Sequence, residues 1–182
     1  MITIIDYGLG NLASVKNMFK KVGVKTIVTS DLEKIKKSTK ILLPGVGSFD
    51  AGMSNLEKTG IKQILLQKAK DGVPILGICL GMQLLTKSSK EGSLRGLGLL
   101  DATVMKFENG LNVKIPHMGW NYIKKSKINK FGLEDNDRFY FVHSFYVNCE
   151  NIEDVMVTTS YGNREFVSGF SKGKKNVDSE SC

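Results

Sequence analysis

The first 90 residues alternate short apolar runs with helix-like segments, and this alternation constrains the fold more than any other feature. The predicted strands are residues 2–6, 24–29, 40–44 and 73–78, and the predicted helices are residues 12–22, 31–38, 55–70 and 80–87. Such an order predicts a largely parallel sheet with helices on both faces. Apart from Lys40, the last two runs are apolar, which is typical of strands buried on both faces.

The second half of the chain has shorter strand-like pieces, at residues 101–107, 111–114, 138–147, 154–161 and 166–171. Turn residues at 108–110 and 161–163 join some of them, which predicts antiparallel strands added to the sheet. The expected fold class is therefore a three-layer α/β structure. We expect residues 1–173 to form one domain and the polar residues 174–182 to be a disordered tail.

The composition argues against several classes of protein. No apolar run approaches the ~20 residues needed to cross a bilayer, and the chain begins on a strand-like run, so we expect no membrane segment and no signal peptide. The three cysteines, Cys79, Cys149 and Cys182, are widely spaced. This spacing fits neither a disulfide framework nor a metal site, which indicates a reduced, cytoplasmic setting.

The net charge of +8 comes mainly from lysines that are spread along the chain. Nucleic-acid binding favours arginines and aromatic residues gathered on one surface. We therefore expect no nucleic-acid partner. The lysines form either a solvated surface or a basic face for an acidic partner or a phosphorylated metabolite.

Two glycine turns follow predicted strands. DYGLGNLA at residues 6–13 fits G-x-G-x-x-A, a variant of the dinucleotide-binding fingerprint, with Asp31 as a rough candidate for the ribose contact. That motif is weak, and a plain strand-to-helix turn is the alternative. PGVGSF at residues 44–49 could hold a developing oxyanion on its backbone N–H groups, or could simply be a turn that needs glycine.

Cys79 lies in Gly77-Ile-Cys-Leu-Gly81, between a predicted strand and a predicted helix. This pattern has the form of a nucleophile elbow, because the sharp turn needs small neighbours and projects the side chain at the carboxyl edge of the sheet. The start of a helix also favours thiolate over thiol. A small core cysteine is the alternative, but the glycines and the preceding PGVG turn favour a nucleophile.

Several longer segments carry a family resemblance. LLPGVGSF and PILGICLGMQLL resemble the class-I, triad-type glutamine amidotransferases. IIDYGLGNLASV, EGSLRGLGLLDATV, IPHMGWN and FYFVHSFYV narrow the resemblance to the glutaminase subunits of imidazole glycerol phosphate synthases. The resemblance runs from residue 2 to about residue 173.

The resemblance implies hydrolysis of glutamine to glutamate and ammonia, without a cofactor or metal. The ammonia would pass to a (β/α)8-barrel synthase subunit in a heterodimer. That subunit makes imidazole glycerol phosphate and an aminoimidazole carboxamide ribotide in histidine biosynthesis. A paralogue that supplies ammonia for surface-sugar amidation remains open, as does a non-catalytic subunit that only binds the synthase.

The resemblance also implies roles for individual residues. Cys79 matches the nucleophile. The positions matching the oxyanion site are Gly45, Val46, Gly47 and Leu80, and those matching the substrate site are Gln83, Glu91, His143, Ser144 and Phe145. The positions matching the partner interface are Tyr7, Gly8, Gly10, Asn11, His117, Met118, Gly119, Trp120 and Asn121.

The base that would serve Cys79 does not follow from the sequence. The family supplies a histidine and a glutamate from a His-Pro-Glu motif near its C-terminus, and the 182 residues do not contain this motif. His117 and His143 are the two histidines of the chain, and we expect neither to replace this base. The resemblance places His117 at the partner interface, and a histidine in an alternating strand, such as His143, is more often a structural hydrogen-bonding residue. Glu180 has no matching surroundings. We therefore expect the activity of these 182 residues to be impaired.

Overall fold

The structure is a computed structural model that describes residues 1–108, 113–126 and 131–173. The expected tail at 174–182, most of the expected turn at 108–110 and part of the expected strand at 111–114 lie outside the described residues. The chain divides into two compact units. Unit 1 comprises residues 1–108 and 144–150, and unit 2 comprises residues 109–143 and 151–182.

Unit 1 contains the predicted parallel sheet. Its strands are β1 (Ile2–Ile5), β2 (Thr26–Thr29), β3 (Ile41–Gly45) and β4 (Ile75–Cys79). They lie in the order β2-β1-β3-β4, and every neighbouring pair is parallel. The order reverses direction after β1, as in doubly wound folds, so the carboxyl ends of these strands form the edge where such folds bind ligands.

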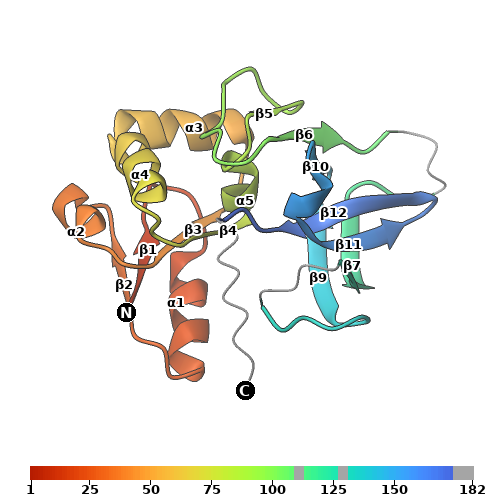
Figure 1. The fold of residues 1–182 in the computed structure, drawn as a ribbon, viewed down its shortest axis with the longest axis horizontal. Helices are drawn as coiled ribbons and strands as arrows, with labels where there is room; N and C mark the ends of the chain where they lie inside the picture. The colour runs from red at the N-terminus through yellow and green to blue at the C-terminus, as the bar shows by residue number, and fades with distance from the viewer. Residues whose placement is uncertain (109–112, 127–130, 174–182) are drawn as a thin grey trace. The chain divides into compact units, whose positions relative to one another are not determined.

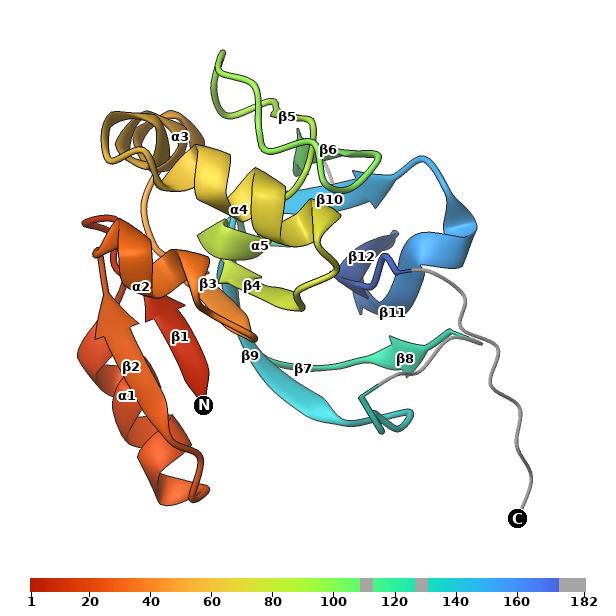
Figure 2. The same cartoon turned by 60° about the vertical axis from the view of Figure 1, so that its left-hand side comes forward.

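Five helices accompany this sheet: α1 (Leu12–Lys21), α2 (Leu32–Lys36), α3 (Phe49–Lys58), α4 (Ile61–Lys70) and α5 (Leu80–Leu84). Figures 1 and 2 show α1 on one face of the sheet and α3, α4 and α5 on the other. The single helix expected over residues 55–70 is two helices, because Gly60 adopts a left-handed φ of 74° that interrupts the helix. The helix expected over residues 80–87 ends at Leu84.

The expectation that the fourth strand is buried was wrong. β3 is buried along its whole length, whereas in β4 the side chains of Leu76 and Ile78 are 46% and 43% exposed. These two residues share one face because side chains alternate along a strand. β4 is the terminal strand in the order β2-β1-β3-β4, and the described residues leave that face open.

Unit 1 also contains β5 (Ser88–Ser89), β6 (Ala102–Lys106) and β10 (Phe145–Cys149). β5 runs parallel to β6, and β10 pairs with β6 in the antiparallel sense, with Phe145 opposite Lys106. The ring of Phe107 lies 4.8 Å from that of Tyr146, which is buried on β10. These contacts attach residues 144–150 to the part of the chain that precedes residue 109.

Unit 2 is antiparallel. Its elements are β7 (His117–Tyr122), β8 (Lys124–Lys125), β9 (Arg138–His143), the short 3-10 helix η1 (Ile152–Asp154), β11 (Val155–Tyr161) and β12 (Arg164–Phe170). β7 pairs with β9, and β11 pairs with both β12 and β8. The strand expected over residues 138–147 is two strands separated at Ser144, and β7 was not predicted.

These elements confirm the α/β class, with a parallel sheet and additional antiparallel strands. The antiparallel strands pair with one another, and the four-stranded sheet of unit 1 remains wholly parallel. None of the described helices has the length and apolar content needed to span a lipid bilayer.

Candidate active site

Cys79 occupies a sharp strand-to-helix turn, as the elbow pattern predicts. It ends β4 and precedes α5, with φ 55° and ψ −116°. A positive φ is uncommon for a residue with a side chain, and such strain concentrates at functional sites. The turn is also tight, because a Cβ at Gly81 would lie 1.8 Å from the carbonyl oxygen of Leu43, and a Cβ at Gly77 would lie 2.6 Å from that of Gly81. The two flanking glycines are therefore steric requirements of the elbow.

The thiol of Cys79 is subject to two opposing effects. The residue keeps substantial solvent exposure, but desolvation by the surrounding protein still raises the pKa of its thiol above the usual value. The backbone N–H of Leu80 lowers the pKa by donating a hydrogen bond to the sulfur. The helix that follows has only five residues. Burial raises the pKa of the thiol more than the Leu80 hydrogen bond lowers it. The elbow by itself therefore does not produce the preference for thiolate that the sequence predicted.

The predicted oxyanion turn lies beside the elbow. Gly45 ends β3 and is paired in register with Cys79 of β4. Val46 is exposed, and Gly47 has φ 109°, which favours glycine. A Cβ at Gly45 would lie 2.3 Å from the hydroxyl of Tyr7 and 3.0 Å from the backbone nitrogen of Gly81. Unit 1 therefore brings the turn and the elbow together without space for side chains between them.

Glu91 binds the backbone at the start of α3. Its Oε2 accepts a hydrogen bond of 2.7 Å from the N–H of Phe49. Phe49 lies two residues after Gly47, the last residue of the predicted oxyanion turn. Asp50 holds the neighbouring loop by accepting hydrogen bonds from the N–H groups of Ser93 and Leu94. These bonds keep the pKa of Asp50 below its usual value. Sequence reasoning missed Asp50, since an aspartate near a helix start carries no distinctive motif.

Gln83, the second residue matched to substrate binding, is buried on α5. Of the remaining matched positions, Ser144 and Phe145 belong to unit 1 and His143 belongs to unit 2. The carbonyl of Ser144 accepts a hydrogen bond of 3.1 Å from Phe107. This bond fixes the chain as it enters β10.

The two histidines of the chain contact each other in unit 2. Nδ1 of His117 lies 2.9 Å from Nε2 of His143, opposite it in the β7–β9 ladder, and Nε2 of His117 lies 3.2 Å from Nδ2 of Asn121. His117 is 2% exposed and stacks on Tyr161 and Phe141. Burial and His143 lower the pKa of His117 to about 4, so it is neutral and a weak base at neutral pH.

The DYGLGN loop closes the carboxyl end of β1. Gly8 and Gly10 have φ of 84° and 118°, and Asn11 caps α1 by accepting a hydrogen bond from Ser14. Met118 and Trp120 of the second predicted interface segment are exposed, whereas the side chains of Tyr7 and His117 are buried. Asp31, the candidate ribose contact, caps α2 instead, by accepting N–H hydrogen bonds from Glu33 and Lys34.

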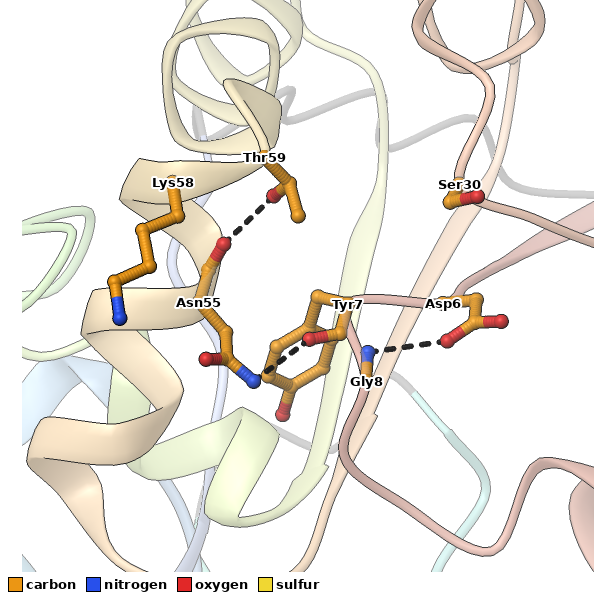
Figure 3. Close-up of a pocket in the computed structure, with 7 residues that line it drawn as sticks. All are labelled: Asp6, Tyr7, Gly8, Ser30, Asn55, Lys58 and Thr59. Carbon is orange, nitrogen blue, oxygen red and sulfur yellow. Dashed lines mark hydrogen bonds between the residues drawn. The ribbon is translucent and has the colours of Figure 1, made fainter.

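A hollow of about 420 Å³ lies at the carboxyl ends of β1 and β2, against α3 (Figure 3). It is lined by Asp6, Tyr7, Gly8, Ser30, Asn55, Lys58 and Thr59. Asn55 donates a hydrogen bond of 3.0 Å to the carbonyl of Tyr7, which joins α3 to the loop. Neither Cys79 nor the oxyanion turn lines this hollow, so it is distinct from the site of the thiol.

Comparison with known proteins identifies the family. The family model described as glutamine amidotransferase class-I matches residues 3–177. The chain belongs to the class-I glutamine amidotransferases. This amidotransferase is 55% identical over 175 residues to "Imidazole glycerol phosphate synthase subunit HisH 2" of Methanococcus maripaludis, covering 94% of the chain and 86% of that protein. It is 44% identical over 182 residues to the HisH 1 subunit of Campylobacter jejuni strain 81-176, covering 96% and 88%.

Solved structures agree on the fold of the amidotransferase. One described as "Crystal structure of glutamine amidotransferase" superposes with a TM-score of 0.69 and 14% identity, covering 91% of this chain and 87% of the other. At that identity the likeness shows the fold alone. The family resemblance and the fold class expected from the sequence are both confirmed, and the chain is an enzyme of the glutamine amidotransferase class by family.

Proposed function

We propose that this chain is the glutaminase subunit of an imidazole glycerol phosphate synthase and serves histidine biosynthesis. The observation that carries this proposal is the 55% identity to a relative with that name over 94% of the chain. Relatives from Pseudomonas aeruginosa and Bdellovibrio bacteriovorus, at 41% and 44% identity, bear the same subunit name. Residues 1–173 would form the amidotransferase domain.

Cys79 is the proposed nucleophile. Its sulfur attacks the carboxamide carbon of glutamine, and the carbonyl oxygen becomes an oxyanion that backbone N–H groups of Gly45, Val46, Gly47 and Leu80 would stabilise. Collapse of this intermediate breaks the C–N bond and releases ammonia once its nitrogen gains a proton. Water then attacks the remaining thioester, giving glutamate and the free thiol. The strained elbow and the adjacent turn support these assignments.

Substrate contacts are proposed for Gln83, Glu91, His143, Ser144 and Phe145. Glu91 already accepts the N–H of Phe49, so its first role would be to fix the backbone beside the oxyanion turn. Asp50 would assist by holding the loop after Glu91. Glutamine binding at this edge of the sheet would then depend on a preformed loop rather than on a free carboxylate.

The proposed partner is a (β/α)8-barrel synthase subunit that receives the ammonia in a heterodimer. One face of the β7–β9 ladder supports a protein interface. Along each strand its residues alternate with less exposed ones, and five of them are exposed: Met118, Trp120, Tyr122, Tyr140 and Val142. Exposed aromatic clusters of this kind mark interaction surfaces. The DYGLGN loop would add Gly8, Gly10 and Asn11, with Tyr7 contributing through its backbone.

A second candidate is a subunit that binds the synthase without hydrolysing glutamine. It is favoured by one observation, since His117 is engaged by His143, Asn121 and two aromatic rings rather than poised as a base. The deciding experiment measures glutamate release with the synthase subunit and a substrate analogue present. Turnover that disappears in Cys79→Ala supports the glutaminase, and tight binding without turnover supports the second candidate.

A further inference from the structure

Tyr7 presents a buried hydroxyl that nothing in the proposed mechanism uses. The residue is 1% exposed, and within the part of the chain that the structure describes its hydroxyl has no hydrogen-bond partner. Buried hydroxyl groups are nearly always paired, so an exception requires an explanation. A buried hydroxyl without a partner can donate a hydrogen bond to an acceptor that forms only during the reaction.

Contacts of the Tyr7 backbone and of the Tyr7 side chain define where the hydroxyl lies. The Tyr7 carbonyl is held by Asn55 of α3, and Figure 3 shows the ring beside Asn55 with its hydroxyl directed away from Asp6. The hydroxyl occupies the space that a side chain at Gly45 would need, 2.3 Å from the position of that missing Cβ. Leu80 and Gly81 approach the same position at 3.0 Å. The hydroxyl therefore lies close to Gly45, which pairs with Cys79, and to Leu80 and Gly81, which follow Cys79 in the sequence.

The electrostatics link the same two groups. Burial, and then the charge of Cys79, raise the pKa of the Tyr7 phenol, so Tyr7 keeps its proton at neutral pH. The carboxylates on the neighbouring segments, Asp6, Asp50 and Glu91, already accept backbone N–H groups. Cys79 is thus the titratable group whose charge acts on Tyr7.

We propose that the Tyr7 hydroxyl donates a hydrogen bond to the Cys79 thiolate and thereby favours formation of the nucleophile. A neutral thiol is a weak acceptor, whereas a thiolate makes strong, charge-assisted hydrogen bonds. The bond would therefore form on ionisation, when the thiol proton leaves to solvent or to a base while Tyr7 keeps its own. Tyr7 acts here as a positioning residue. The inference rests on the proposed nucleophile but not on turnover of glutamine.

The test measures the reactivity of Cys79 directly. In a background with Cys149→Ser and Cys182→Ser, Cys79 is the single thiol, and its alkylation by iodoacetamide is followed from pH 6 to pH 10. Tyr7→Phe keeps the ring and removes the donor. We expect the inflection of the rate profile to rise by roughly half to one pH unit, and the rate below the inflection to fall about three- to tenfold. The limiting rate at high pH should stay unchanged.

Tyr161→Phe is the matched control, because the Tyr161 hydroxyl donates its hydrogen bond to the carbonyl of Lys114 within unit 2 and its loss should leave the profile unchanged. An unchanged profile in folded Tyr7→Phe would overturn the proposal, even if that variant lost stability. If Tyr7→Phe does not fold, replacement of all tyrosines by the more acidic 3-fluorotyrosine tests the same bond. The inflection should then fall, and no change would overturn the proposal. Neither result depends on glutaminase activity, so failure of the proposed function is detected separately.

Discussion

Cysteine and histidine are both common catalytic residues, yet Cys79 in unit 1 and the His117–His143 pair in unit 2 have different surroundings. Cys79 has a strained backbone, retains solvent exposure and is paired in register with Gly45, against which the buried Tyr7 hydroxyl lies without a described partner. His117 is buried, with both ring nitrogens engaged and aromatic rings stacked against it. The contrast supports the proposal that Cys79 is the reactive residue, because strain and unsatisfied polar groups concentrate at functional sites, and it supports a structural role for His117.

Removal of the thiol should have the largest effect. We expect Cys79→Ala to reduce the parent's glutamate release to the rate measured without protein, because the covalent route is lost. Cys149→Ala is the control, since Cys149 is a half-buried cysteine on β10. Its activity should stay within about twofold of the parent. Comparable loss in both variants would mean that Cys79 has no special role.

The two strands that support the elbow should differ in their contribution to stability. Leu43 on β3 is fully buried, so Leu43→Ala should lower the free energy of unfolding by about 2–5 kcal/mol. Leu76 on β4 is half-exposed, and Leu76→Ala should cost less than about 1 kcal/mol. Urea denaturation of both variants provides the measurement. A large loss at Leu76 would show that this face of β4 is covered in solution.

Acid should weaken unit 2 through His117. The pKa of its imidazole falls from the ordinary 6.5 to about 4 on folding, so the unfolded chain binds more protons between these values. Stability is therefore fully present above about pH 6.5 and declines as the pH falls toward 4, by roughly 1–3 kcal/mol. His117→Gln should flatten this dependence in unfolding measured from pH 7.5 to pH 4.5. If the stability of His117→Gln depended on pH as strongly as that of the parent, a group other than His117 would be responsible.

The opposite side of β7 should matter for binding rather than for stability. Trp120 is 63% exposed, and Trp120→Ala should weaken binding of the synthase subunit about 10- to 100-fold, as for an interface anchor. Ile152→Ala is the control, because Ile152 is exposed on η1 and belongs to neither proposed interface segment. Titration calorimetry gives both dissociation constants. Equal affinities would remove the β7–β9 face from the interface.

The sequence allowed much of unit 1 to be predicted. The order of strands and helices and the elbow at Cys79 follow from local patterns, because glycine turns and apolar runs leave clear signals. The exposure of Leu76 and Ile78 could not be predicted from such patterns. An apolar run indicates that a strand forms but does not indicate what covers its faces. β7 was missed because IPHMGWN contains proline and glycine and lacks a clear alternation.

The candidate site was predictable in outline but not in its supporting contacts. Cys79 and the turn at Gly45–Gly47 stand out as motifs, whereas Asp50 binds Ser93 and the hydroxyl of Tyr7 lies beside Gly45, contacts between residues far apart in sequence. The Tyr7 side chain is buried, and Asn55 of α3 holds the carbonyl of the same residue. Such long-range contacts leave no local pattern to detect.

The most direct test of Cys79 as the reactive residue is covalent labelling with a chloroketone analogue of glutamine. The labelled peptides would be identified by mass spectrometry, with and without excess glutamine. We predict one adduct, on the peptide that contains Cys79, and protection by glutamine. Labelling spread equally over Cys79, Cys149 and Cys182, or labelling that glutamine does not prevent, would contradict the account.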